Sequence, residues 1–428
     1  MQTIRGLEAG RVALSRGVSF SLDTDGREQA VRRIINDVSI RGDAAVREYT
    51  QKFDGVALDS LEVGRDEVAA ARQQLSPELL SALKLAADRI RAFHAAQMNV
   101  IQSGTGGPGL DWRVRPLNRV GVYAPHGTAP YPSSLLMTAV PAKVAGVPEV
   151  ILATPRGSDG TLPAATLVAA DIAGVDRIFS IGGAQAIAAL ALGTKSVPRV
   201  DKVCGPGNIY VMLAKKLLFG TVGIDALQGP SEVLIIADET ADPEYCAADL
   251  LAQAEHDELA EAILVTTSVE LAERVTEEVS RQLEELSRKE IAAASLEQNG
   301  KIVLVSNMDE AVELANLYAP EHLLLMVDGA ESYVDRLSNA GCIILGEKGT
   351  VVLGDYVEGP SHVLPTQGTA RFSSPLSVLD FVRLTNVVSV DESNLAELGP
   401  AAMAIADFEG FDAHVRAVER RLKGRNKK

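Results

Sequence analysis

The sequence predicts an α/β protein made of two doubly wound units, each a parallel sheet covered by helices. Short, apolar, β-branched segments alternate with helical segments from about residue 119 to residue 346. These strand segments lack the polar alternation of a sheet with one solvated face, so helices should cover both faces. At 428 residues, the chain is also long for a single hydrophobic core.

The elements follow in order along the chain. Helices are expected over 27–55 and over 76–98, with Ser76 as the N-cap of the second helix. Strands are expected at 119–124, 149–154, 177–182, 200–204, 232–237, 261–266, 301–305 and 342–346. The helices between them are expected at 133–145, 184–193, 208–219, 244–257 and 268–290. From about residue 376 onward, strands are no longer expected and helices should complete the chain as an arm or lid.

Composition narrows the class of protein. The chain is 46% hydrophobic and 23% charged, as in a soluble globular protein, and its net charge of −16 argues against a nucleic-acid partner. No apolar run is long enough to predict a membrane span, and the first residues do not resemble a signal peptide. Three scattered cysteines (Cys204, Cys246 and Cys342) exclude a disulfide framework, so a cytoplasmic location is expected.

Histidine is scarce, and the six histidines therefore help to locate candidate sites. His94 lies in a charged amphipathic segment and is expected to be solvated or partly packed. The segment AADLLAQAEHDE (247–258) should place Asp249, Gln253 and His256 on one face of a helix. These three side chains either complete a hydrogen-bond network in an ordinary core or bind a ligand.

A second candidate is the consecutive pair Glu321 and His322 in NLYAPEHLLL, which stands just before an apolar strand. A carboxylate beside an imidazole suits general acid–base catalysis, because the two groups can be tuned to different proton affinities. A single Glu-His pair is nevertheless common by chance.

Two further segments present carboxylates and imidazoles. GDYVEGPSHVLPT (354–366) is expected to be a stiff loop that is neither helix nor central strand, and FEGFDAHVRAVERR (408–421) should begin a helix, with Asp412 as a possible N-cap. They present Asp355, Glu358, His362, Glu409 and His414. Together, Gln253, His256, Asp355 and His414 form a nitrogen and oxygen ligand set that zinc accepts, although their spacing matches no fixed motif.

Two glycine-rich turns stand between a predicted strand and a predicted helix, in SIGGAQAIAALALG (180–193) and in VCGPGNIYVMLAKK (203–216). Such turns allow the backbone to approach a phosphate at a helix N-terminus. Neither is a G-x-G-x-x-G motif, so each is either a tight turn or part of a cofactor site.

Taken together, the motifs resemble the histidinol dehydrogenase family, in the family's order, from about residue 20 to residue 421. The resemblance is carried by RVGVYAPHGTAPYPSSLLMTAVPAKVAGVPEV, GGAQAIAALALGT, VDKVCGPGNIYV, GPSEVLIIADET, AADLLAQAEHD, YAPEHL, GDYVEGPSHVLPTQGTARFSS and EGFDAHVRAVERR. It implies oxidation of L-histidinol to L-histidine through the aldehyde, with two NAD+ consumed.

The resemblance also implies roles for individual residues. It assigns one zinc ion per subunit to Gln253, His256, Asp355 and His414, and catalysis to Glu321 and His322. NAD+ contacts fall on Tyr123, Gln185 and Asn208. Substrate contacts fall on Ser231, His362 and Glu409, together with His322 and the four zinc ligands. An intertwined homodimer is implied, in which His414 and Glu409 reach the site of the other subunit.

The fold implied by the resemblance is α/β, with two incomplete Rossmann-like domains containing parallel sheets, plus smaller helical N- and C-terminal elements. The expected boundaries are an N-terminal helical element at 1–26, a first Rossmann-like domain formed by 27–119 and 233–375, a second at 120–232, and a C-terminal arm at 376–428.

The match has departures. The family usually has glycine at His126, alanine at Gln228, a YTPEA-like run at 347–352 and asparagine at Ser361. Because of these departures, a related zinc and NAD+ dehydrogenase for another small polar alcohol, such as a sulfonated diol, remains the alternative. A non-catalytic zinc-stabilised scaffold is the rival from another class, and it would tolerate replacement of Glu321 and His322.

Overall fold

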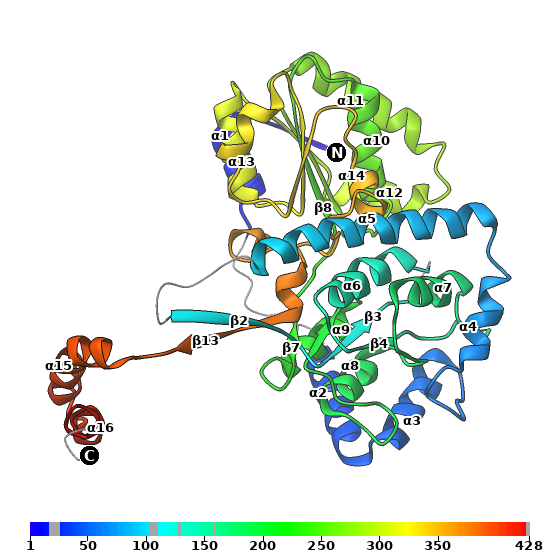
Figure 1. Cartoon of the computed structure of the whole chain (residues 1–428). Helices are drawn as coiled ribbons and strands as arrows, with labels where there is room; N and C mark the ends of the chain where they lie inside the picture. Colours follow the sequence, from blue (N-terminus) through cyan, green and yellow to red (C-terminus); the bar gives the residue numbers. More distant parts are fainter. Residues whose placement is uncertain (17–25, 103–109, 127–129, 158, 425–428) are drawn as a thin grey trace. The chain divides into compact units, whose positions relative to one another are not determined.

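The computed structural model describes residues 1–16, 26–102, 110–126, 130–157 and 159–424. Residues 1–98 and 116–381 form one compact unit, and residues 99–115 and 382–428 form a second (Figure 1). The first unit contains two parallel sheets covered by helices, which confirms the predicted fold class. In the part of the chain that is described, no helix combines the length and apolar character needed to cross a membrane.

The larger sheet of the first unit has six parallel strands. Their order is β1 (Gln2–Arg5), β10 (Lys301–Leu304), β9 (Glu261–Thr266), β8 (Glu232–Ala237), β11 (His322–Met326) and β12 (Cys342–Leu345). Alternate residues of β8 contribute to two hydrophobic clusters, with Val233 and Ile235 in one and Leu234 and Ile236 in the other. Both faces of this sheet are therefore buried, as its apolar strands predict.

Helices from distant parts of the chain cover the six-stranded sheet. One face is covered by α10 (Pro243–Ala254), α11 (Val269–Leu283) and α12 (Lys289–Gln298). The other face is covered by α1 (Leu7–Leu14) and α13 (Met308–Tyr318), and the 3-10 helix η1 (Ala330–Arg336) adds to that cluster. The short helix α14 (Val351–Tyr356) contacts α10.

The smaller sheet has five parallel strands. Their order is β5 (Arg177–Phe179), β4 (Glu149–Ala153), β3 (Arg119–Tyr123), β6 (Lys202–Cys204) and β7 (Gly223–Ile224). One of its hydrophobic clusters includes residues of α2 (Arg27–Arg41), α3 (Asp43–Asp54), α8 (Gly183–Leu192) and α9 (Ile209–Leu218). Helices α6 (Pro132–Val144) and α7 (Ala164–Ala173) pack together beside β3 and β4, and α4 (Arg65–Arg72) contacts α7.

The helices of residues 27–72 thus pack with the five-stranded sheet, which differs from the expected grouping of 27–119 with 233–375. Polar contacts explain this placement. The Asp43 carboxylate accepts hydrogen bonds from Thr194 Oγ1 at 2.5 Å and from Ser196 Oγ at 2.6 Å, and Arg156 forms a salt bridge with Glu67. Hydrophobic periodicity predicts that a helix has a buried face, but it does not identify the sheet against which that face packs.

Several helices begin or end at residues other than those predicted, and backbone geometry explains the main difference. Gly42, with φ 54° and ψ −129°, divides the expected helix 27–55 into α2 and α3. The expected helix 268–290 corresponds to α11, which ends at Leu283, and α12 was not predicted. Ser76 does cap α5 (Pro77–Gln102), since its hydroxyl accepts from the Leu79 N–H. His94 in α5 is fully buried, not solvated, because its Nδ1 donates to the Ile90 carbonyl.

Strands β1 and β7 were not predicted, and neither were β2 (Leu110–Pro116) and β13 (Val382–Val388). The expectation that strands end before residue 376 was therefore wrong, since β13 pairs with β2 in a two-stranded sheet. The second unit also contains α15 (Glu392–Phe408) and α16 (Asp412–Lys423). Phe411, not Asp412, occupies the N-cap position of α16. Two 3-10 helices, η2 (Thr369–Arg371) and η3 (Val378–Phe381), precede β13.

The Asp43 contacts generate a stability prediction. We expect Asp43→Ala to lower the free energy of unfolding by about 1–3 kcal/mol, because three donors at the end of α8 lose their acceptor. Urea denaturation would measure this change, with Asp59→Ala at an exposed position as the control. Equal stability of the two variants would show that these contacts do not hold α3 in place.

Candidate active site

The site is built around the partly buried carboxylate of Asp355, on α14. His322 Nε2 lies 3.3 Å from Asp355 Oδ1, and Asp355 and His322 both line a cavity of about 370 Å³. His362, which also lines this cavity, donates from Nδ1 to the Asp355 main-chain oxygen at 2.7 Å. One residue therefore orients two imidazoles, through its side chain and through its backbone.

The structure corrects the predicted position of Asp355. The segment 354–366 was expected to contain no helix, but Asp355 lies in the last turn of α14. This helix begins at the N-cap Thr350, whose hydroxyl accepts from the Val352 N–H and donates to Asp249 Oδ1. Of the two alternatives open for Asp249, the structure thus supports a hydrogen-bond network. Asp249 anchors the start of the helix that carries Asp355.

The pair Glu321 and His322 lies at the amino end of β11. The Glu321 side chain is buried, and its Oε2 accepts from the Glu232 N–H at 2.8 Å and lies 3.9 Å from His322 Nδ1. Burial raises the pKa of Glu321 to about 7, so its carboxylate can both accept and release a proton near neutral pH. The predicted neighbourhood of an apolar strand is confirmed.

The pKa values of His322 and His362 are shifted in opposite directions. Burial lowers the pKa of His322, but the hydrogen bond to Asp355 and the charge of Glu321 outweigh it, so the pKa of His322 is raised. Burial also lowers the pKa of His362, and here it prevails over the attraction of Asp355. For Asp355 burial acts to raise the pKa, yet the hydrogen bond to His322 and the nearby imidazoles lower it overall.

Gln253 and His256 lie at the end of α10. This helix ends at Ala254, three residues before the predicted end, so His256 lies in the following turn, where its N–H donates to the Gln253 carbonyl. Although His256 is exposed as a residue, desolvation of its ring by the surrounding protein lowers its pKa, and the ring interacts electrostatically with Asp355 and His322. Gln253 Oε1 is buried and has no hydrogen-bond partner among the described residues.

A second group of predicted residues lies at the carboxyl edge of the five-stranded sheet. Tyr123 ends β3, and its hydroxyl accepts from the Gly183 N–H at 3.0 Å. Gln185, in the first turn of α8, is 1% exposed, and neither atom of its amide has a partner among the described residues. Asn208 caps α9, because its Oδ1 accepts from the N–H groups of Tyr210 and Val211.

The two sheets meet between these groups. Ser134, in the first turn of α6, is hydrogen-bonded to His362 Nε2 at 3.1 Å, and Ser361 Oγ donates to the Met137 carbonyl. The cavity lined by His322 and His362 thus borders the helix that follows β3. Ser134, Thr350 and Glu232 were not predicted as residues of the site. Glu232 could have been noticed as the only charged residue of the apolar strand EVLIIA.

Ser231 immediately precedes Glu232, whose N–H donates to Glu321. Glu409 and His414 belong to the second unit. Glu409 follows α15 as its C-cap, and the His414 ring lies 5.2 Å from the Phe411 ring. Both side chains are exposed in that unit.

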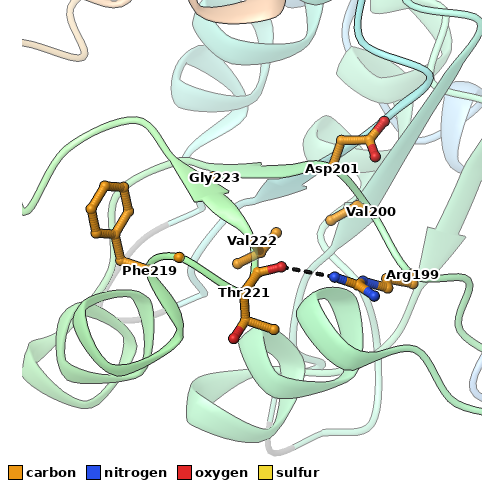
Figure 2. Close-up of a pocket in the computed structure, with 8 residues that line it drawn as sticks. Arg199, Val200, Asp201, Phe219, Thr221, Val222 and Gly223 are labelled. Atoms are coloured by element: carbon orange, nitrogen blue, oxygen red, sulfur yellow. Dashed lines mark hydrogen bonds between the residues drawn. The ribbon is translucent and has the colours of Figure 1, made fainter. Parts of the chain in front are cut away.

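Another cavity, of about 260 Å³, lies at the amino ends of β6 and β7 (Figure 2). Arg199 donates there to the Thr221 carbonyl at 2.9 Å, and Asp201 accepts from the N–H groups of Asn118 and Arg119. The polar groups are engaged in holding loops together, and none of the predicted site residues lines this cavity.

The raised pKa of Glu321 generates a pH prediction. A carboxyl group with a pKa raised by folding stabilises the fold below its ordinary pKa, and this contribution is lost as pH rises through about 7. We therefore expect the excess stability of metal-free Glu321→Gln over the unchanged chain to be larger at pH 8 than at pH 5. Urea denaturation at both pH values measures it, and Glu297→Gln, at an exposed position, controls for loss of one carboxylate. A constant difference would contradict the burial argument.

The comparisons with known proteins agree with one another. A family model described as histidinol dehydrogenase matches residues 20–422. The histidinol dehydrogenases of Dehalococcoides mccartyi and Deinococcus radiodurans are 53% and 49% identical, each covering 99% of this chain and 100% of the relative. The crystal structure of histidinol dehydrogenase from Elizabethkingia anophelis is 36% identical, with a TM-score of 0.94, covering 100% of this chain and 99% of that one.

Proposed function

Because the chain belongs to the histidinol dehydrogenase family, we propose that it oxidises L-histidinol to L-histidine through the aldehyde, with two NAD+ reduced. The observation that carries the proposal is the buried arrangement of Glu321, His322 and Asp355 beside a cavity. Glu321 and His322 can each exchange a proton with a substrate, and Asp355 orients His322. A scaffold without catalytic function would have no need of this arrangement.

We propose that Gln253, His256 and Asp355 bind a zinc ion, with His414 as the fourth ligand. The donor set fits this metal. Gln253 Oε1 is a buried acceptor without a partner among the described residues, and His256 has a lowered pKa that favours the neutral imidazole which metals bind. The lowered pKa of Asp355 keeps its carboxylate ionised. When bound, zinc would hold the imidazole and amine of the amino alcohol in place.

We propose that Tyr123, Gln185 and Asn208 contact NAD+, which would accept the hydride in each oxidation. The unpartnered Gln185 amide supports this role, because a buried amide without hydrogen bonds is costly unless a ligand completes them. Substrate contacts are assigned to Ser231, to His362 and to Glu409. Both ring nitrogens of His362 are already engaged, and this fixes the orientation of its ring.

The catalytic pair would act in sequence. In the first oxidation, His322 accepts the hydroxyl proton of the alcohol, and Asp355 stabilises the imidazolium that forms. In the second, Glu321 takes a proton from the water that adds to the aldehyde carbon, so that the hydrate can be oxidised to the carboxylic acid. A pKa of about 7 suits Glu321 to this role near neutral pH.

The proposed assembly is a homodimer in which His414 and Glu409 reach the other subunit's site. Helix α15 supports this proposal, because Leu398, Ile405 and Phe408 are 59%, 61% and 92% exposed and recur at helical spacing. An apolar stripe of this kind favours a protein partner. We propose that the C-terminal arm (376–428) contributes this contact, and that the enzyme works in the cytoplasm, where its three unpaired cysteines remain reduced.

The reaction is tested by mixing the purified protein with L-histidinol, NAD+ and zinc and recording NADH absorbance. We expect His322→Gln to lower kcat by about 10²- to 10⁴-fold, because the general base is lost, while zinc content stays unchanged. His94→Gln, at a buried histidine on α5, is the matched control and should keep its turnover. Turnover of another polar diol but not of histidinol would replace the proposed substrate.

The metal site makes a separate prediction. We expect His256→Ala and His414→Ala each to lose zinc and activity while the secondary structure remains intact, because each removes one of four ligands. Elemental analysis after dialysis and far-UV circular dichroism would measure the two properties. Full zinc content in either variant would remove that residue from the ligand set.

Mixing the two inactive variants tests the dimer arrangement. After co-refolding, a mixed dimer would contain one complete site, made from the His256 of one subunit and the partner subunit's His414. Partial recovery of activity is therefore expected. If all four ligands came from one chain, the mixture would stay inactive.

A further inference from the structure

A buried polar network connects the glycine turn (residues 204–208) to the segment that joins the two sheets. Its members are Lys215 on α9, Asp225 just after β7, and Gln228. The side chains of Lys215 and Asp225 are 1% and 2% exposed and form an ion pair. Gln228 bridges the two, because its Oε1 accepts from Lys215 Nζ at 3.0 Å and its Nε2 donates to Asp225 Oδ2 at 3.2 Å.

The network holds both backbone groups of a single residue, Gly205. The Gly205 N–H donates to Asp225 Oδ2 at 2.7 Å, and the Gly205 carbonyl accepts from Lys215 Nζ at 3.1 Å. Lys215 thus directs its donors at three acceptors, which is what a buried ammonium group requires. Gly205 has φ 115°, and a Cβ there would lie 2.1 Å from the Tyr123 carbonyl oxygen. The turn is therefore packed directly against the end of β3.

The segment that contains Asp225 and Gln228 also leads towards Glu321. Residues 225–231 connect β7 of the five-stranded sheet to β8 of the six-stranded sheet. Within this connection, the Gly229 N–H donates to Thr366 Oγ1 at 2.7 Å, and the connection ends at Glu232, whose N–H donates to Glu321. Through Lys215 and Asp225, Gln228 is therefore connected to the glycine turn, and it belongs to the segment that leads to Glu232.

We propose that Lys215, Asp225 and Gln228 are positioning residues for the dinucleotide, and that they hold the glycine turn and Asn208 in the conformation that binds it. This inference rests on the proposed function, since it assumes that NAD+ binds at Tyr123, Gln185 and Asn208. Gln228 is the residue of this network whose replacement tests the proposal most directly. Its amide closes the network without carrying a charge, so its loss leaves the ion pair in place.

The test replaces Gln228 by methionine, which has a similar length and cannot make these hydrogen bonds. We expect the Kd of NAD+, measured by calorimetry on the zinc-loaded protein, and the KM for NAD+ to rise roughly tenfold, the size of one hydrogen bond to a charged group. We expect kcat and the KM for histidinol to stay within about twofold. The change should appear in the dinucleotide parameters, because the turn that precedes Asn208 is released.

A matched control separates positioning from stability. Thr194→Val removes a hydrogen bond to Asp43 at the opposite end of α8, and it should lower Tm without changing the Kd of NAD+. An unchanged Kd in Gln228→Met, or a fall in kcat alone, would overturn the inference. Absence of NAD+ binding and turnover in the unchanged chain would instead overturn the proposed function.

Discussion

The contact between Asp355 and His322 is the interaction on which the rest of the site depends. A carboxylate that is largely removed from water is stabilised where positive or hydrogen-bonding groups surround it, and the imidazoles of the site supply that environment for Asp355. Residues outside the site hold this carboxylate in position. Asp249 fixes Thr350, Thr350 begins α14, and α14 presents Asp355. The position of one carboxylate is thus maintained by two helices from distant parts of the chain.

The two sheets contribute opposite ends to the region around the cavity. Glu321, Glu232 and Cys342 stand at amino ends of strands in the six-stranded sheet, whereas Tyr123 stands at a carboxyl end in the five-stranded sheet. Ligands of open α/β sheets usually bind at carboxyl ends. Here only the proposed cofactor residues follow that rule, and the proposed catalytic pair lies at the amino edge, where buried backbone N–H groups such as that of Glu232 are available.

Much of the fold could be predicted from the sequence, because a pattern of continuous apolar strands between amphipathic helices is compatible with few folds other than a parallel sheet covered by helices. The helix boundaries at Gly42 and Ala254 could not, since they depend on backbone geometry and on the neighbours that each segment meets in the folded chain. The pairing of β13 with β2 and the packing of α2 and α3 were missed for the same reason. For the site, Glu321 and His322 could be selected as neighbours in sequence, but their relation to Asp355 is set by tertiary contacts. Local pattern carries no information about such a contact.

The separation of the proposed substrate and cofactor residues between different sheets has a consequence for the proposed reaction, which would use two NAD+ molecules per turnover. Of the groups proposed to hold the amino alcohol, Ser231, His322 and Asp355 belong to the part of the chain with the six-stranded sheet, whereas the groups proposed to hold the nucleotide stand at the five-stranded sheet. Spent nucleotide can then depart while the half-oxidised compound stays anchored. A reactive aldehyde would thereby be kept from the surrounding solution.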